Sequence, residues 1–305
     1  MRVTQGMISD NNLRHISNSY SKLNTYMDQL STGKKVNKPS DDPVTVMKGM
    51  NYRSEVSRIN QYKRNTGEVH NWMDNTDSAL DKATQTLQKL RELAVQASND
   101  SYSDKERKNV QKEAEQLKEH FVDIINTKVN GDYIFNGTNT SNPPIDEDGN
   151  FQGDTINKGS VVIEVAAGTK IQANVNPENV FGALKDAGGT DEDNKVFGVL
   201  ADIQALIDDL GEKDADISAN ISSLDDRIDD VINARADLGA RMNRLDLIED
   251  RLEDQEIVAT KIMSDNEDVD FEKVITDLIT QESVHRAALS AGSRMIQPSL
   301  IDFLR

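Results

Sequence analysis

The sequence predicts a mainly α-helical protein: an elongated antiparallel helical bundle or coiled coil with paired N- and C-termini and a small β-rich insert in the middle. Three observations predict this fold. Apolar residues recur in steps of three and four through the first and last thirds of the chain, as in a heptad seam. Glycine and proline collect in the middle, where residues 131–198 hold ten of the 17 glycines and three of the six prolines. Hydrophobic content is 36% and aromatic content 5%, both typical of helical bundles.

The chain is organised around a predicted helix near its N-terminus, over residues 13–30. Six apolar residues share one stripe of this helix because they alternate in steps of three and four. They are Leu13, Ile16, Tyr20, Leu23, Met27 and Leu30. Burying one such stripe returns less free energy than ordering the helix costs, so the helix needs a partner.

A helix stop and a new helix start follow this stripe. Ser31-Thr32-Gly33 is a stop because glycine adopts the left-handed conformation at low cost. The next helix is predicted to begin at Ser40-Asp41-Asp42-Pro43. Serine and aspartate are good N-cap residues, and proline suits the first helical turn.

Three further seams predict a helical hairpin and a long helix. The first runs from Val69 to Ala97, and the second runs from Val110 to Ile124 behind a capping box at Ser103–Glu106. The break between these two is short, which favours an antiparallel hairpin. The third seam keeps heptad positions from Ile217 to Leu252, and we expect it to pack against the hairpin.

The middle of the chain predicts a small β insert. Composition changes at Gly131, and the segments Val161–Val165 and Ile171–Val175 are strand-like. Ala167–Thr169 lies between them and reads as a hairpin turn. Helix is predicted to return at about Lys195.

The last part of the chain carries a stripe that we expect to pair with residues 13–30. Polar or small residues, Gln281, His285 and Gly292, fill three of its positions, so both terminal stripes are thin and should need neighbours from other chains. The apolar members of this stripe are Val274, Leu278, Ala288 and Met295.

This arrangement predicts three domains, each with its own role. A terminal coiled-coil assembly domain comprises residues 1–44 plus 270–305. A helical rod domain comprises residues 45–135 plus 199–269. A β-rich outer insert comprises residues 136–198.

Composition and motifs point away from catalysis and nucleic-acid binding. The net charge of −18 argues against a partner with a phosphate backbone. The absence of cysteine excludes disulfides and thiolate sites, and the four histidines have no metal-ligand spacing. We therefore expect no catalytic residue, no cofactor and no bound metal. Residues 1–72 carry 11 basic and 6 acidic residues, which suits either a basic arm for an acidic surface or solubility alone.

Membrane and secretion signals are not evident in the sequence. No apolar run reaches the length of a membrane span, so we expect no membrane partner. The first residues lack the apolar region of a secretory signal peptide. Export from the cell would therefore need another route.

Several motifs resemble those of the bacterial flagellin superfamily. The segment from Leu30 to Pro43 resembles the N-terminal signature of that family. Within it, Pro39-Ser40-Asp41-Asp42-Pro43 is similar to the form found in its hook-associated branch, whereas flagellin itself usually shows Asp-Asp-Ala-Ala-Gly there. Residues 131–137 resemble the family's exit from the helical domain, and residues 299–304 resemble the C-terminal end of the hook-associated branch.

The resemblance implies a structural protein of the bacterial flagellum at the junction between hook and filament, exported through the flagellar type III apparatus. It implies self-association in a ring or tube, with a neighbouring hook-associated protein and flagellin as further partners. An export chaperone would hold the C-terminal helix. The implied assembly interface consists of the first stripe together with Leu278, Ala288, Met295, Leu300, Phe303 and Leu304.

Two other functions stay open at this point, and an enzyme is a distant third. The nearer alternative is flagellin, the filament subunit, although Pro39, Pro43 and the Phe303-Leu304 ending count against it. The further alternative is a coiled-coil signalling or adhesion protein, which would be expected to carry a membrane anchor. An enzyme in the β insert would need a polar constellation that the insert lacks.

Overall fold

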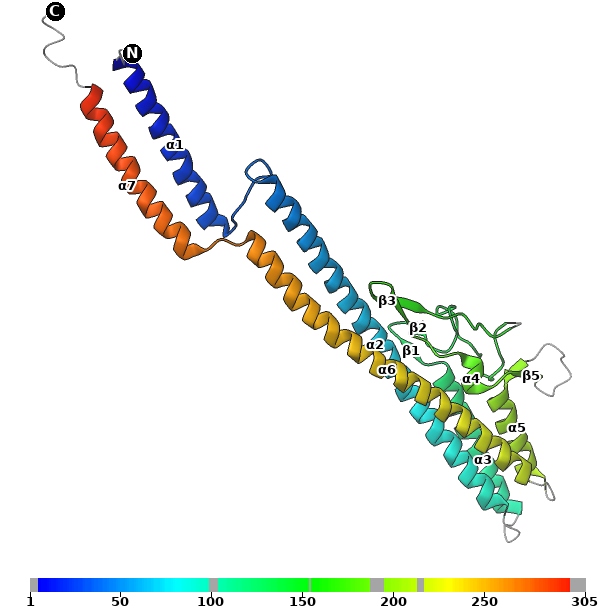
Figure 1. The fold of residues 1–305 in the computed structure, drawn as a ribbon. Helices are drawn as coiled ribbons and strands as arrows, with labels where there is room; N and C mark the ends of the chain where they lie inside the picture. The colour runs from blue at the N-terminus through cyan, green and yellow to red at the C-terminus, as the bar shows by residue number, and fades with distance from the viewer. Residues whose placement is uncertain (1–4, 99–103, 154, 187–194, 213–216, 297–305) are drawn as a thin grey trace, which may run out of the picture. The chain divides into compact units, whose positions relative to one another are not determined.

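The computed structural model describes residues 5–98, 104–153, 155–186, 195–212 and 217–296. They belong to two compact units: unit 1 combines Met1–Arg58 with Asp254–Arg305, and unit 2 is Ile59–Glu253. The helices (Figure 1) are α1 (Gln5–Thr32), α2 (Pro43–Ala97), α3 (Asp104–Ile125), α4 (Pro177–Phe181), α5 (Gly198–Gly211), α6 (Ser218–Glu267) and α7 (Phe271–Ile296). The strands are β1 (Lys128–Val129), β2 (Asp132–Tyr133), β3 (Val162–Ala166), β4 (Thr169–Gln172), β5 (Leu184–Asp186) and β6 (Lys195–Phe197).

The predicted fold class is confirmed. The structure is mainly helical, its N- and C-terminal helices pair, and its strands lie in the middle of the sequence. The two longest helices, α2 with 55 residues and α6 with 50, each contribute to both units.

In unit 1, α1 and α7 lie side by side and antiparallel (Figure 1). The predicted stripe of α7 faces α1: Val274 and Gly292 are buried, and the positions between them are half-buried. The helices are close at Gly292, where a Cβ atom would lie 3.6 Å from the Cδ1 atom of Ile16, an ordinary van der Waals distance. Near the middle of the pair, the ring centroids of Tyr20 and His285 are 6.2 Å apart.

In unit 2, the helices enclose a core that the heptad seams predicted. Of the α2 seam, Met73, Leu80, Leu87 and Leu90 are fully buried. On α6, Leu238 and Leu245 are fully buried and Met242 is half-buried. On α3, the predicted positions Val110, Ala114, Phe121 and Ile124 are also buried, with Leu117 half-buried. Period-3.6 patterning therefore located this core correctly.

Ion pairs fix the antiparallel register of α2 and α6 within unit 2. Arg235 on α6 donates to Asp77 at 3.0 Å and to Asp81 at 2.8 Å, both on α2. Further along α2, Arg91 pairs with Asp225, which lies earlier on α6. The two helices therefore run in opposite directions through this unit.

The middle of the chain forms three two-stranded antiparallel sheets, β1-β2, β3-β4 and β5-β6. The β3-β4 hairpin turns at Gly168, whose φ of 71° suits glycine, so the predicted turn is confirmed. Its second strand covers Thr169–Gln172 instead of the predicted Ile171–Val175. Helix returns first as the short α4, and α5 begins at Gly198 instead of the predicted Lys195, because Lys195–Phe197 pairs with β5 as strand β6.

A cluster of phenylalanine rings joins residues 128–197, which we call the middle segment, to the helices of unit 2. Phe121 of α3 packs edge-on against Phe181 of α4, with ring centroids 6.0 Å apart. Phe181 also meets Phe135 at 5.1 Å and Phe197 at 5.5 Å, and Phe197 meets Phe151 at 5.4 Å. The middle segment therefore shares a hydrophobic core with α3.

Within the described ranges, no helix combines the length and hydropathy needed to cross a bilayer. The same ranges contain no group of three or more histidine, aspartate or glutamate side chains placed to hold a metal ion.

Candidate assembly interface

The predicted stripe on α1 divides into two lines. Ile16, Leu23 and Leu30 are half-buried against α7. The other three members face solvent: Leu13 is 59% exposed, Tyr20 59% and Met27 61%. Each line repeats every seven residues, so the two lines run beside one another along the helix. Pairing with α7 therefore covers only half of the stripe.

Helix α7 has the same division. Leu278 and Ala288 are half-buried in the pair with α1. Ile275, Ile279 and Leu289 are exposed on α7. Met295 belongs to α7, but its side chain lies outside the described residues, as do the other predicted interface residues Leu300, Phe303 and Leu304.

Exposed apolar side chains are concentrated in unit 1. Of the 19 large apolar residues that the described part of the chain leaves exposed, 15 belong to unit 1, although it is the smaller unit. Unit 1 is also close to electrical neutrality, with 14 basic and 15 acidic residues, whereas unit 2 has 21 and 38. A surface with many exposed apolar side chains and almost no net charge suits protein–protein contact.

The signature residues form the start of α2. Asp42 is the N-cap: its carboxylate accepts hydrogen bonds from the backbone N–H groups of Val44 at 3.0 Å and Thr45 at 3.2 Å. The Thr45 hydroxyl also donates to it at 2.6 Å, and these bonds lower the pKa of Asp42. Pro43 is the first helical residue. The predicted helix start is confirmed, and Pro39, Ser40 and Asp41 form the exposed turn before it.

The signature turn lies in a second feature of unit 1, which we call the elbow: residues 33–42, residues 267–270, and the side of α2 that they contact. Glu267 is only 8% exposed, and its Oε2 atom accepts hydrogen bonds from Arg53 Nε at 3.0 Å and Nη2 at 2.6 Å. Lys34 Nζ lies 3.4 Å from the same oxygen and 2.6 Å from Asp268 Oδ1.

The elbow charges shift one another's ionisation. Burial opposes the charged form of Glu267, but hydrogen bonds and charges from Arg53 and Lys34 outweigh it, so the pKa of Glu267 lies below its ordinary value. Hydrogen bonds from Lys34 and Ser264 lower the pKa of Asp268. Sequence reasoning missed this cluster, because its members are more than 200 residues apart and show no local spacing.

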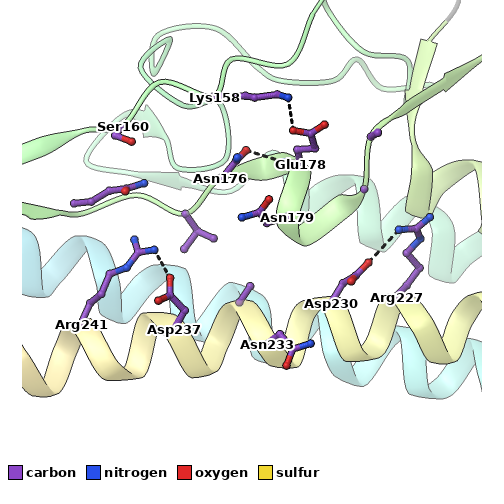
Figure 2. Close-up of a pocket in the computed structure, with 15 residues that line it drawn as sticks. Lys158, Ser160, Asn176, Glu178, Asn179, Arg227, Asp230, Asn233, Asp237 and Arg241 are labelled. Carbon is purple, nitrogen blue, oxygen red and sulfur yellow. Dashed lines mark hydrogen bonds and ion pairs between the residues drawn. The ribbon is translucent and has the colours of Figure 1, made fainter.

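Unit 2 contains a polar groove of about 700 Å³ between α6 and the middle segment (Figure 2). Its charged side chains pair within the chain: Lys158 with Glu178, Arg227 with Asp230, and Arg241 with Asp237. Arg241 also donates to the backbone carbonyl of Asn174 at 3.1 Å. This hydrogen bond helps to hold the middle segment on α6.

Two family models match the chain, the bacterial flagellin N-terminal helical region over residues 3–140 and its C-terminal helical region over residues 221–304. Flagellar hook-associated protein 3 of Escherichia coli K12 is 27% identical over 310 residues, covering 97% of each chain. The protein of the same name from Salmonella typhimurium is 24% identical and aligns over 100% of each chain. The flagellin of Bacillus subtilis is 25% identical, also over 100% of each chain.

Solved structures share the fold. FlgL of Bacillus cereus aligns with a TM-score of 0.58 at 22% identity, covering 70% of this chain and 99% of that one. The flagellar junction protein FlgL of Legionella pneumophila aligns with a TM-score of 0.54 at 16% identity, covering 72% and 99%. Since the two matching regions account for both helical parts of the sequence in the expected order, the chain belongs to the bacterial flagellin family.

Proposed function

We propose that this chain is a hook-associated protein of the flagellum, the structural subunit of the junction between hook and filament on which flagellin assembles. As a member of the flagellin family it is a structural component of the flagellum and not an enzyme. The relatives named flagellar hook-associated protein 3, which align over nearly the whole chain, support the junction role.

One structural observation carries the proposal. Unit 1 exposes lines of apolar side chains that its own helices leave uncovered, among them Leu13, Tyr20 and Met27 on α1 and Ile275 and Ile279 on α7. Water-exposed apolar lines of this kind are stabilised when neighbouring molecules cover them. We infer that copies of the chain pack through unit 1 in a ring or tube, with the α1 and α7 residues at the interface.

The exposed apolar lines of unit 1 are also where we expect the other proposed partners to bind. A neighbouring hook-associated protein on one side and flagellin on the other would contact the layer, and an export chaperone would cover the apolar line of α7 before secretion. Flagellin is the alternative identity, because flagellins also align over the full chain. The signature residues Pro39, Ser40, Asp41, Asp42 and Pro43, with their resemblance to the hook-associated branch, favour the junction.

The test is to delete the gene in the source bacterium and image the flagella. We expect hooks without filaments, and rescue by the wild-type gene. An antibody against the chain should label one band at the hook tip. Label along the whole filament would support flagellin instead, and normal filaments in the deletion strain would contradict the junction role.

The interface is tested with a matched pair of variants. Replacing Leu13, Tyr20 and Met27 by serine should abolish rescue, since assembly would lose its apolar contacts. Replacing Val162 and Ile232 by serine removes exposed apolar side chains from unit 2 and should leave rescue intact. Equal rescue by both variants would contradict an interface on α1.

A further inference from the structure

We propose that Glu267 is the residue that positions α1 and α7 for assembly, by locking the two connections of the elbow onto the start of α2. The inference rests on the proposed function and deepens it, because it names the contact that makes unit 1 a single assembly-competent body. Backbone pairing, side-chain contacts and one glycine carry it independently.

The backbone brings the two connections together. The Lys35 N–H donates to the carbonyl of Glu267 at 2.7 Å, and the Val269 N–H donates to the carbonyl of Gly33 at 3.0 Å. Lys34 and Asp268 thereby form an antiparallel bridge. The connection between α1 and α2 is thus bound to the connection between α6 and α7.

The side chain of Glu267 adds a third element to this contact. Its Oε2 atom accepts hydrogen bonds from Nε and Nη2 of Arg53 on α2 and lies 3.4 Å from Lys34 Nζ in the first connection. Asn266, the preceding residue, also donates from its side chain to the carbonyl of Thr45 on α2, at 3.1 Å. A charged acceptor that is nearly buried strengthens such bonds and fixes their geometry.

Gly49 on α2 makes room for this carboxylate. A Cβ atom at Gly49 would lie 2.5 Å from Glu267 Oε1, a separation that real Cβ atoms do not show, so the carboxylate would have to move. Glycine weakens the interior of a helix relative to alanine, and no left-handed backbone requires it here. Space for Glu267 therefore explains the glycine at this position.

The first experiment compares two glycine variants of α2. Gly49→Ala keeps every charge but displaces Glu267, whereas Gly67→Ala is the control, because a Cβ atom there meets nothing within 4 Å. Hook occupancy is measured by quantitative immunoblot of isolated flagella. We expect Gly49→Ala to lower occupancy about tenfold or more, the equivalent of one charged hydrogen bond, and Gly67→Ala to leave it unchanged.

The second experiment removes the charge. Glu267→Gln should lower hook occupancy. The control is Glu55→Gln, which breaks an exposed ion pair between Glu55 and Arg58 on α2 and should leave hook occupancy unchanged. Trp72 is the single tryptophan and belongs to unit 2, so its fluorescence should report an unchanged melting of that unit.

A pH profile separates positioning from general stability. The folded pKa of Glu267 is lowered, so its contribution is present at neutral pH and is lost as pH falls through that pKa. Wild-type subunits should dissociate from isolated flagella as pH falls through this range, and in Glu267→Gln only the smaller part of that step that Asp268 contributes should remain. The charged groups that face this cluster are Lys34 and Lys35 on the first connection, Arg53 on α2 and the carboxylate of Asp268 on the second connection.

Full occupancy and a wild-type pH step in Glu267→Gln would overturn the inference, as would equal occupancy of the two glycine variants. If the wild-type chain itself does not join hooks, the proposed function fails instead. The two failures are therefore distinguishable in one set of strains.

Discussion

Gln281 on α7 donates a hydrogen bond from its side-chain amide to the hydroxyl of Ser19 on α1, with 2.9 Å between Nε2 and Oγ. Ser19 is only 5% exposed and lies between the half-buried residues Ile16 and Leu23. A buried polar pair in an otherwise apolar seam favours one register, because sliding either helix leaves both groups without a partner.

This pair yields the first prediction. Gln281→Leu should destabilise the α1–α7 pair by about 1–3 kcal/mol, because the Ser19 hydroxyl then stays buried without its bond. Adding Ser19→Ala should restore much of that stability. Amide hydrogen exchange of α1 and α7 measures the effect, and identical protection in all three proteins would contradict the role given to the pair.

The second prediction concerns the core of unit 2. Leu87 is fully buried on α2, so Leu87→Asp places a carboxylate where no water reaches it and should destabilise unit 2 by several kcal/mol. The control is Gln88→Asp, one residue further along and exposed. Urea unfolding followed by Trp72 fluorescence distinguishes them. A wild-type midpoint for Leu87→Asp would show that the helices of unit 2 pack differently.

The third prediction concerns the phenylalanine cluster. Phe181 touches rings from α3, the loop after β2 and β6, so Phe181→Ala should leave a cavity and cost about 3–5 kcal/mol of unit 2 stability. Phe271→Ala is the matched control, since Phe271 is 51% exposed and belongs to unit 1. Should both variants melt alike by calorimetry, the cluster is not part of the core.

The fourth prediction concerns α1 and α7 in the free subunit. With half of each stripe uncovered, these helices should open more readily than unit 2 in dilute monomer. Trypsin should therefore cut first at Arg14, Lys22, Lys273 and Arg286, leaving a core of about residues 45–265. The same sites should resist in isolated flagella. Slow hydrogen exchange of α1 and α7 in the monomer would contradict this coupling of order to assembly.

Heptad spacing predicted most of the helical architecture because burial in a seam depends on local periodicity. It placed Leu80, Leu87 and Leu238 in the core and aligned the stripe of α7 with α1. It grouped Leu13 with Ile16, although the structure separates them. Periodicity identifies residues that share a side of a helix, whereas the width of that side covered by a partner depends on the partner.

Features that join distant segments were not predictable in the same way. Glu267 and Arg53 meet across 214 residues, and neither stands at a distinctive spacing. The lone signal was Gly49, a helix-weakening residue inside a helical segment. The phenylalanines likewise follow no period. The middle segment was therefore expected to lie outside the helices, although Phe151, Phe181 and Phe197 tie it to the core of α3.

The uneven charge of the two units has a consequence for growth of the assembly. Unit 2 carries 38 acidic and 21 basic residues, so every added copy brings a large negative charge next to its neighbours. Dissolved cations screen this repulsion, with a Debye length of about 10 Å at 0.1 M salt. The same ions weaken the half-buried pair of Lys34 with Asp268. The rate of polymer growth should therefore pass through a maximum as ionic strength rises. Repulsion between subunits limits growth at low ionic strength, and weakening of the elbow contacts limits it at high ionic strength.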